Sequence, residues 1–255
     1  MLTRPTSRRP RAGTALAIAL ISGLLLAACG SDARTVGPTT TARSTTTTGS
    51  TTTTTTPPPA TVATAVVRSV PVTDEPGGPT VRTLKNPTDT GAPLTFLVVQ
   101  QQGKDLQVIL PVRPNGSRGW IATENVKLSA DPYRVVVELG AHRLQAFNGA
   151  EVVLDAPIGV GTAETPTPGG TYFIKELLKT SRPGGPYGPY AYGLSGFSNV
   201  LTDFAGGTGV IGIHGTNEPQ LVGRDVSHGC IRLRNEDILT LVPVLPLGTP
   251  VEIRA

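Results

Sequence analysis

Residue types capable of covalent chemistry lie close together in the stretch VSHGCIRL, residues 226–233. Cys230 is one of two cysteines in the chain, and His214 and His228 are two of its three histidines. A cysteine attacks as its thiolate, which is scarce at neutral pH when the pKa has its ordinary value of about 8.5. A neighbouring imidazole can take the proton and leave a thiolate–imidazolium pair. Together these residues predict nucleophilic acyl transfer by Cys230, with His214 or His228 as the base.

Acyl transfer also requires hydrogen-bond donors for the negative charge that develops on the substrate oxygen. Gly229 directly precedes Cys230, and its lack of a side chain lets backbone N–H groups approach a substrate carbonyl. The same turn is therefore predicted to supply both the nucleophile and an oxyanion pocket.

Two other classes of site use these residue types. Two histidines and a cysteine could be three zinc ligands, but no fourth ligand follows at a usual zinc-site spacing. A lone cysteine is often a small buried hydrophobic residue. The Ser-His-Gly sequence directly before Cys230 argues against this structural role, because a buried cysteine needs no such neighbours. We predict neither a metal nor a cofactor.

The arrangement IHGTNEPQLVGRDVSHGCIRL resembles the signature of the L,D-transpeptidase (YkuD) family. That signature is a histidine, a gap of a dozen or so residues, then Ser/Thr-His-Gly-Cys, an apolar residue and Asn or Arg. The resemblance extends through VVVELGAHRLQAF, TPTPGGTYFI and the ending GTPVEI, so it indicates a catalytic domain over residues 130–255.

The resemblance implies a role for each motif residue. Cys230 takes the place of the nucleophile and His214 that of its base, with the Gly215 carbonyl orienting the imidazole. His228 is expected to shape the oxyanion pocket together with backbone N–H groups. The full set of expected oxyanion and substrate-binding residues is Ser227, His228, Gly229, Gly215 and Arg232, where Arg232 contacts substrate or braces its strand.

The resemblance also implies a reaction on peptidoglycan stem peptides. Cys230 attacks the carbonyl of the third stem residue, D-alanine leaves, and an amine of a neighbouring stem opens the thioester to give a 3→3 cross-link. Carbapenems are expected to acylate the same cysteine. Two alternatives stay open from the sequence: an L,D-carboxypeptidase, in which water takes the acyl group, and a non-catalytic wall-binding lipoprotein.

These residues need a scaffold that brings distant segments together. Residues 133–161 read as β-strands in a hairpin, with a type I′ turn at Asn148-Gly149 and with His142 as a structural strand residue. VIGIHG reads as a buried strand ending at His214, and GTPVEIRA as a closing strand.

RNEDILTLVPVL is the one expected helix, with Asn235 as its N-cap. Residues 180–209 read as an irregular loop, of which 183–197 is a candidate substrate lid.

Residues 62–129 are expected to form a separate small domain. The runs AVVRSV, LTFLVVQQQ and LQVILPVR are rich in β-formers and are separated by turn residues. The ending with Gly119-Trp120 resembles that of bacterial SH3-like domains, with Trp120 expected in the core and wall binding as the alternative. The predicted fold class is therefore mainly β, a YkuD-type catalytic domain with one short helix preceded by an SH3-like β-barrel.

The N-terminus predicts export and anchoring. Residues 1–28 combine arginines with an apolar run, as in a secretory signal, and Leu26-Ala27-Ala28-Cys29 resembles the bacterial lipobox, in which Cys29 receives lipid. Residues 29–61 are rich in Thr and Pro and read as a disordered tether. The expected location is the outer face of the cell membrane, held by the lipid and facing the cell wall.

The charge balance argues against a nucleic-acid partner. The whole chain carries a formal net charge of +4. Loss of the four arginines in residues 1–28 leaves 18 basic and 18 acidic side chains. A mature chain without net positive charge lacks the usual electrostatic footprint of a nucleic-acid-binding protein.

Overall fold

The computed structural model describes residues 56–203 and 207–255, within a compact unit that spans residues 53–255. The predicted signal 1–28, the lipid site Cys29 and most of the predicted tether 29–61 lie outside the described residues. In the part of the chain that is described, no helix has both the length and the hydropathy of a membrane span.

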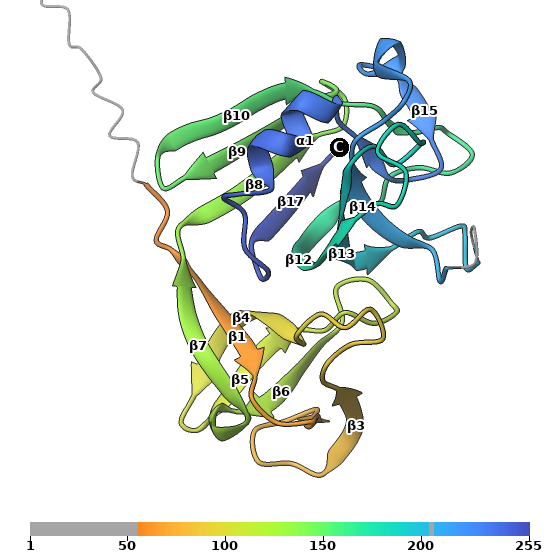
Figure 1. Cartoon of the computed structure of the whole chain (residues 1–255). Helices are drawn as coiled ribbons and strands as arrows, with labels where there is room; N and C mark the ends of the chain where they lie inside the picture. Colours follow the sequence, from red (N-terminus) through yellow and green to blue (C-terminus); the bar gives the residue numbers. More distant parts are fainter. Residues whose placement is uncertain (1–55, 204–206) are drawn as a thin grey trace, which may run out of the picture. The chain divides into compact units, whose positions relative to one another are not determined.

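The first sheet is antiparallel and contains seven strands in the order β3-β2-β6-β5-β4-β1-β7 (Figure 1). Alternation of side-chain burial is typical of such strands, as in β2, where Val70 and Val72 are buried and Ser69 and Pro71 are exposed. The strands are β1 (Ala60–Ala65), β2 (Ser69–Thr73), β3 (Thr80–Lys85), β4 (Thr95–Gln102), β5 (Asp105–Ile109), β6 (Arg118–Ala122) and β7 (Val126–Asp131). A 3-10 turn, η1 (Thr123–Asn125), precedes β7.

Two details of this sheet differ from the sequence prediction. The run AVVRSV, expected as one strand, is divided at Val66, which is 61% exposed and donates its N–H to the Asn125 carbonyl. Strand β3 had no predicted counterpart because it lies at the sheet edge and lacks an alternating buried face. Trp120 on β6 is buried, as predicted for a core residue.

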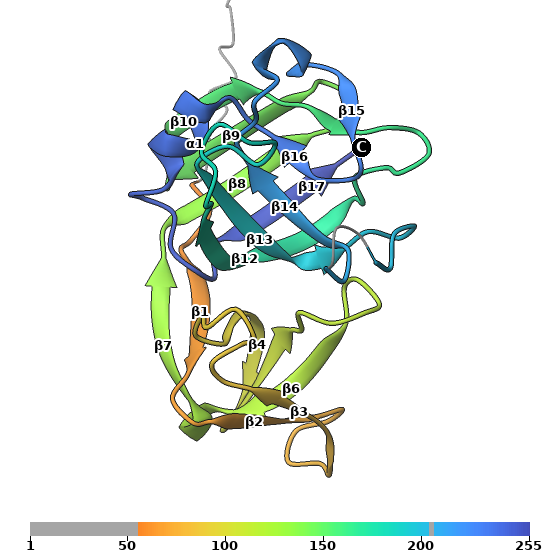
Figure 2. The same cartoon turned by 45° about the vertical axis from the view of Figure 1, so that its right-hand side comes forward.

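The second sheet contains eight strands in the order β10-β9-β8-β17-β12-β13-β14-β16. Figure 2 shows β12, β13, β14 and β16 side by side. The strands are β8 (Tyr133–Glu138), β9 (Arg143–Asn148), β10 (Glu151–Pro157), β12 (Gly170–Lys179), β13 (Tyr190–Phe197), β14 (Val210–His214), β16 (Ile231–Arg232) and β17 (Pro250–Arg254). A separate parallel pair joins β11 (Val160–Gly161) to β15 (Asp225–Ser227), and η2 (Pro219–Leu221) is a 3-10 turn.

The hairpin of β8, β9 and β10 is confirmed, but its turns differ from those predicted. Asn148 pairs with Glu151, so the two loop residues are Gly149 and Ala150. Gly149 has φ +56°, whereas Ala150 is not among the residues with positive φ. A type I′ turn requires positive φ at both loop positions, so that prediction is wrong. His142 lies in the turn between β8 and β9 rather than in a strand, with φ +49°.

The predicted irregular loop 180–209 contains a regular strand. Residues 190–197 form β13, which pairs with β12 on one side and β14 on the other. Its glycines reflect close packing: a Cβ on Gly193 would lie 2.6 Å from Glu176 Cγ, and one on Gly196 would lie 2.5 Å from Tyr172 Cδ1. Only residues 183–189 of the predicted lid remain as a loop.

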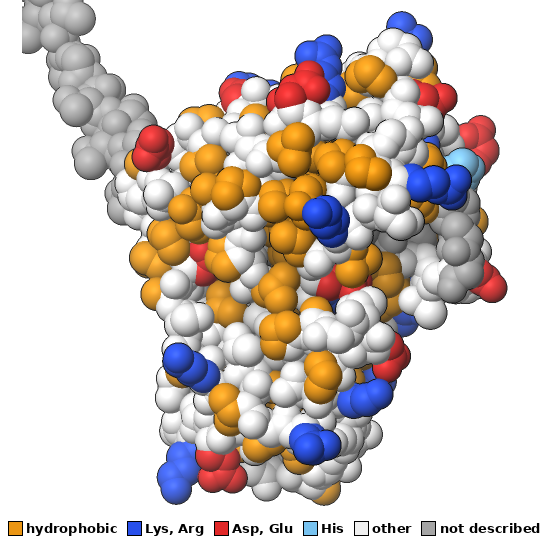
Figure 3. Space-filling model, in the orientation of Figure 1, with side chains coloured by type: hydrophobic (Ala, Val, Ile, Leu, Met, Phe, Trp, Pro, Cys, Tyr) orange, Lys and Arg blue, Asp and Glu red, His pale blue; other side chains and the backbone are white. Residues whose placement is uncertain are grey.

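The helix α1 (Asn235–Leu241) buries Ile238 and Leu241 in the core of the second sheet. The predicted N-cap is one residue too late, because the cap position is Arg234 and no side chain caps the helix. The prediction of a mainly β fold with one short helix is confirmed for the described residues. On the face shown in Figure 3, hydrophobic side chains gather over the region of α1 and β17, and charged side chains of both signs are scattered.

Candidate active site

Cys230 lies in the tight turn that joins β15 to β16. The Ser227 hydroxyl donates to the Cys230 carbonyl at 2.5 Å and accepts from the Gly229 N–H at 3.0 Å. Gly229 has φ +114°, a conformation that glycine adopts without a steric penalty. The serine and glycine of the motif therefore shape the turn that presents the sulfur. The Gly229 N–H, expected from the sequence as an oxyanion donor, donates to the Ser227 hydroxyl in this structure.

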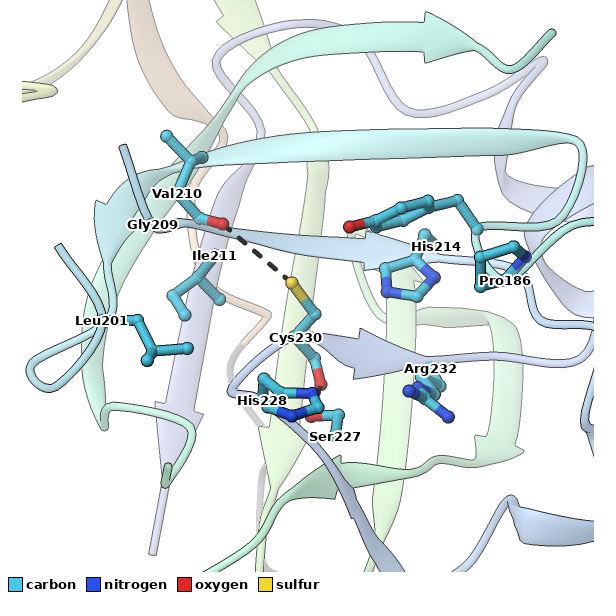
Figure 4. A pocket seen from close by; sticks show the side chains of 11 residues that line it. Pro186, Leu201, Gly209, Val210, Ile211, His214, Ser227, His228, Cys230 and Arg232 are labelled. Carbon is cyan, nitrogen blue, oxygen red and sulfur yellow. Dashed lines mark hydrogen bonds between the residues drawn. The ribbon is translucent and has the colours of Figure 1, made fainter. Parts of the chain in front are cut away.

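Strand pairing brings His214 close to this turn. β14 ends at His214 and runs parallel to β16, with His214 opposite Arg232 and Ile213 opposite Ile231. Cys230 immediately precedes β16, so the pairing carries it to the edge of β14. Figure 4 shows His214 and Cys230 among the side chains that line one pocket. Spacing in the sequence left open which histidine stands at this position.

The His214 ring is buried and held on two sides. Its Nδ1 lies 2.6 Å from the Gly215 carbonyl oxygen. The Tyr187 ring approaches it with centroids 4.8 Å apart at an angle of 59°. Asn235 Oδ1 accepts the Thr216 N–H at 2.9 Å, which fixes the backbone just after Gly215. Asn235, which the sequence predicted as a helix N-cap, thus supports the backbone next to His214. The local sequence does not distinguish a capping asparagine from one that supports a distant loop.

Burial governs the protonation of the pair. It lowers the pKa of His214 to about 4, a shift that Arg232 reinforces and the Gly215 carbonyl opposes. Burial raises the pKa of the Cys230 thiol, opposed by the Gly212 backbone N–H and by Arg232. Both directions disfavour charge, so burial favours a neutral thiol and a neutral imidazole as the resting forms.

Sulfur and imidazole share a cavity of about 330 Å³. The thiol points toward the Val210 carbonyl oxygen, 4.0 Å from the sulfur (Figure 4). The cavity is lined by Pro186, Tyr187, Leu201, Gly209, Val210, Ile211, His214, Ser227, His228, Cys230 and Arg232. Five of the predicted site residues therefore line one cavity: His214, Ser227, His228, Cys230 and Arg232. Gly215 and Gly229 are not among its lining residues.

Arg232 is the cationic side chain of this cavity. Its Nη1 lies 3.1 Å from Glu218 Oε2, and its side chain is 17% exposed against 46% for Glu218. Its Nε is buried and has no partner among the described residues. Its backbone pairs in both directions with Gly159, at 2.8 and 2.9 Å. Arg232 therefore both braces the strand and presents a positive charge to the cavity.

His142 lies apart from this cavity. Its Nε2 is 2.8 Å from Asp225 Oδ1 on β15, so it braces the strand that leads into the cysteine turn, in line with the structural role predicted for it. Across residues 56–203 and 207–255, no group of three or more His, Cys, Asp and Glu side chains is arranged to hold a metal ion.

A cysteine and a buried histidine at one cavity, with a backbone acceptor on the imidazole, are the groups that cysteine-dependent acyl transfer requires. The profile of the L,D-transpeptidase catalytic domain (YkuD) matches residues 132–253. The YqjB protein of Bacillus subtilis, assigned to the L,D-transpeptidases, is 32% identical over 141 residues, covering 52% of this chain and 76% of that protein. The chain belongs to the L,D-transpeptidase (YkuD) family.

Other relatives match the same region. The YkuD protein of Bacillus licheniformis is 38% identical over 122 residues, which cover 48% of this chain and 66% of that protein. Among solved structures, a mutant of the Enterococcus faecium L,D-transpeptidase has 24% identity and a TM-score of 0.38, covering 49% of this chain and 50% of that one. L,D-transpeptidase 3 from Mycobacterium tuberculosis with a faropenem-derived adduct has 17% identity and a TM-score of 0.40, covering 56% and 76%.

Proposed function

We propose that the protein is a peptidoglycan L,D-transpeptidase that forms 3→3 cross-links through a thioester on Cys230. The observation that carries this proposal is that Cys230 and His214 line one cavity, with the imidazole oriented by the Gly215 carbonyl. Family membership supplies the substrate class, and the geometry supports a role for each group.

The tautomer of His214 follows from its partner. A carbonyl oxygen only accepts hydrogen bonds, so the neutral ring carries its proton on Nδ1, next to Gly215 O. The Nε2 lone pair is then available for the thiol proton. As that proton moves to Nε2, the sulfur attacks the carbonyl carbon of the third stem residue and the carbonyl electrons move to its oxygen.

The tetrahedral intermediate collapses by breaking the bond to D-alanine. The imidazolium of His214 gives its proton to the departing amine, and a thioester remains on Cys230. We assign stabilisation of the oxyanion to the Cys230 N–H and the His228 side chain, because the Gly229 N–H is held by Ser227. Such donors are effective in a site from which water is largely excluded.

The second half repeats these steps in reverse. The amine of an acceptor stem loses a proton to His214 Nε2 and attacks the thioester carbonyl. The sulfur leaves and recovers a proton from the imidazolium, which restores the neutral pair. If water takes the place of the amine, the product is a shortened stem, which is the carboxypeptidase alternative.

Arg232 is proposed to bind the carboxylate of the D-alanine that leaves. Its guanidinium already binds a carboxylate, that of Glu218, through Nη1. Arginine can engage carboxylates through two parallel N–H groups, and Arg232 shares the cavity with Cys230. A contact of this kind selects stems that end in a free D-amino acid.

The proposed cellular location rests on the sequence. Lipid on Cys29 and a Thr-rich tether would hold the enzyme at the outer face of the cell membrane, within reach of the wall polymer.

Incubation of the purified protein with disaccharide tetrapeptide, followed by mass spectrometry, tests the proposed reaction. Cross-linked dimer with release of D-alanine is the expected product, and Cys230→Ala should form none. Disaccharide tripeptide without dimer identifies a carboxypeptidase instead. Dimer formed by Cys230→Ala at the wild-type rate rules out the assigned nucleophile.

A further inference from the structure

The turn between β5 and β6, residues 110–117, reaches into the part of the chain that surrounds Cys230. Arg113 Nη1 donates to the Ser198 carbonyl at 2.7 Å, and Nη2 donates to the carbonyls of Leu201 and Thr208, both at 3.0 Å. One guanidinium thus joins the described stretches 198–203 and 207–209, which together are called the wall segments below.

Asn115 makes a second attachment from the same turn. Its Nδ2 donates to the Phe197 carbonyl at 2.7 Å, and its Oδ1 accepts the Phe197 N–H at 2.8 Å. The side-chain amide therefore satisfies both backbone groups of Phe197 at the end of β13, as a neighbouring strand would. Arg113 also stacks over the Phe197 ring, with Cζ 4.9 Å from its centroid.

The wall segments form one side of the Cys230 cavity. Leu201 and Gly209 line it, followed by Val210, whose carbonyl faces the sulfur. The Ser198 N–H donates to the Gly209 carbonyl at 2.7 Å. A Cβ added to Gly209 would lie 3.1 Å from Arg113 Nη2. The position of this wall is therefore set by contacts from the first sheet as well as by its own backbone.

Residues of the first sheet also border the sulfur from a second direction. A larger cavity of about 760 Å³ reaches Cys230 and His214. Among its lining residues are Lys85 at the end of β3, Thr88 in the loop that follows, and Pro111 in the turn between β5 and β6. The catalytic cysteine is thus accessible along a space that both sheets line.

We propose that the first sheet is a component of the active site, with Arg113 and Asn115 as positioning residues that hold the wall segments against the substrate. The proposal rests on the proposed function, because the wall matters only if an acyl donor binds beside Cys230. Neither side chain touches the reacting atoms. Misplacement of a substrate-binding wall lowers reactivity without changing the nucleophile itself.

Two probes of Cys230 separate positioning from general damage. Imipenem must fit the cavity before it acylates the thiol, and its adduct is followed by mass spectrometry. Iodoacetamide is small and reports on the intrinsic reactivity of the thiol. The variants are Arg113→Ala, Arg113→Lys and Asn115→Ala. Arg118→Ala is the matched control, since Arg118 is an exposed arginine on β6 at the end of the same turn.

Arg113→Ala is expected to lower the second-order rate constant of imipenem acylation by about 10- to 100-fold, and Asn115→Ala by a smaller factor. Alkylation by iodoacetamide should stay within about twofold of wild type in each. Arg113→Lys should recover only part of the rate, because one ammonium cannot match the planar fork that spans three carbonyls. Arg118→Ala should match wild type with both reagents.

Wild-type acylation rates in Arg113→Ala and Asn115→Ala overturn the positioning role, and so does an equal loss with both reagents. If Arg113→Ala does not fold, as judged by its thermal melt, Arg113→Lys and Asn115→Ala decide by the same criteria. Wild-type protein that imipenem does not acylate at all contradicts the proposed function instead, so the two failures are distinct.

Discussion

The imidazole of His214 is held by the residue that follows it in the chain, with 2.6 Å between His214 Nδ1 and the Gly215 carbonyl oxygen. This contact fixes the tautomer and aims the other ring nitrogen at the cavity. A backbone carbonyl performs the task that a carboxylate performs in a Ser-His-Asp triad. Because a carbonyl has no full charge, it opposes only in part the lowering of the His214 pKa by burial.

Gly215→Ala tests this arrangement. A Cβ at position 215 would overlap Asn235 Oδ1 and lie 3.0 Å from Pro189 Cδ, so the backbone that carries the carbonyl must shift. We expect imipenem acylation to fall by about 100-fold. Gly140→Ala is the matched control, since nothing lies within 4 Å of its added Cβ, and it should react at the wild-type rate. Equal rates for the two variants would show that the Gly215 carbonyl does not position the base.

The neutral resting pair predicts two different pH profiles. Acylation by imipenem needs neutral His214, whose pKa is about 4, so the rate should rise as pH passes that value and then level off. Alkylation by iodoacetamide depends on thiolate, and the pKa of Cys230 is raised. Its rate should therefore keep rising above the range where an ordinary thiol ionises. Alkylation that is flat from pH 5 to 8 would indicate a resting ion pair and contradict this assignment.

The free energy of unfolding should also depend on pH through the buried His214. The pKa of His214 in the folded protein, about 4, lies below its ordinary value of 6.5, so the unfolded chain binds more protons between these two pH values. The contribution of neutral His214 to the free energy of unfolding is fully present above pH 6.5 and declines as the pH falls toward 4. The loss amounts to about 3 kcal/mol of unfolding free energy. His214→Gln should remove this part of the slope in urea titrations at pH 7 and pH 4.5. An unchanged slope would place the titration elsewhere.

Local patterns predicted the elements that carry the chemistry. The strand ending at His214, the hairpin of β8 and β9, the closing strand β17 and the helix all have signals within a few residues. The cysteine turn was identified by its own four residues. These features depend on side-chain alternation and turn residues, which short sequence windows contain.

Long-range contacts were not accessible in this way. Asn235 supports the Gly215 backbone through Thr216, 19 residues away in sequence, and Arg113 reaches carbonyls 85 to 95 residues away. The glycines of β13 suggested a loop from the sequence. Glycine is required there because Glu176 and Tyr172 on the adjacent strand β12 occupy the space that a Cβ would need. Pairing partners decide such positions, and a single sequence does not reveal them.

The anchor at Cys29 is tested by fractionation. Cys29→Ala removes the thiol that would carry lipid, so the protein should leave the membrane fraction and lose the mass of the lipid. Activity on soluble disaccharide tetrapeptide should be unchanged, because the catalytic residues are untouched. Cys29→Ala protein that remains in the membrane fraction with unaltered mass would contradict the lipoprotein hypothesis.

Arg232 offers the sharpest test of substrate selection. If its guanidinium binds the carboxylate of the leaving D-alanine, wild type should prefer a tetrapeptide with a free C-terminus over the same peptide ending in an amide. A hydrogen bond to a charged group contributes about 1.5–3 kcal/mol, so the preference in kcat/KM should be about 10- to 150-fold.

Arg232→Gln should lose most of that preference by slowing the free acid while leaving the amide nearly unchanged. Glu218→Gln is the control, because it removes the carboxylate that now occupies Nη1 and leaves the cation in place, so the preference should persist or grow. A purely structural role for Arg232 predicts the opposite pattern, in which both peptides slow equally and their ratio is preserved. That result in a folded Arg232→Gln variant would remove Arg232 from the binding site and leave it only as a brace for β16.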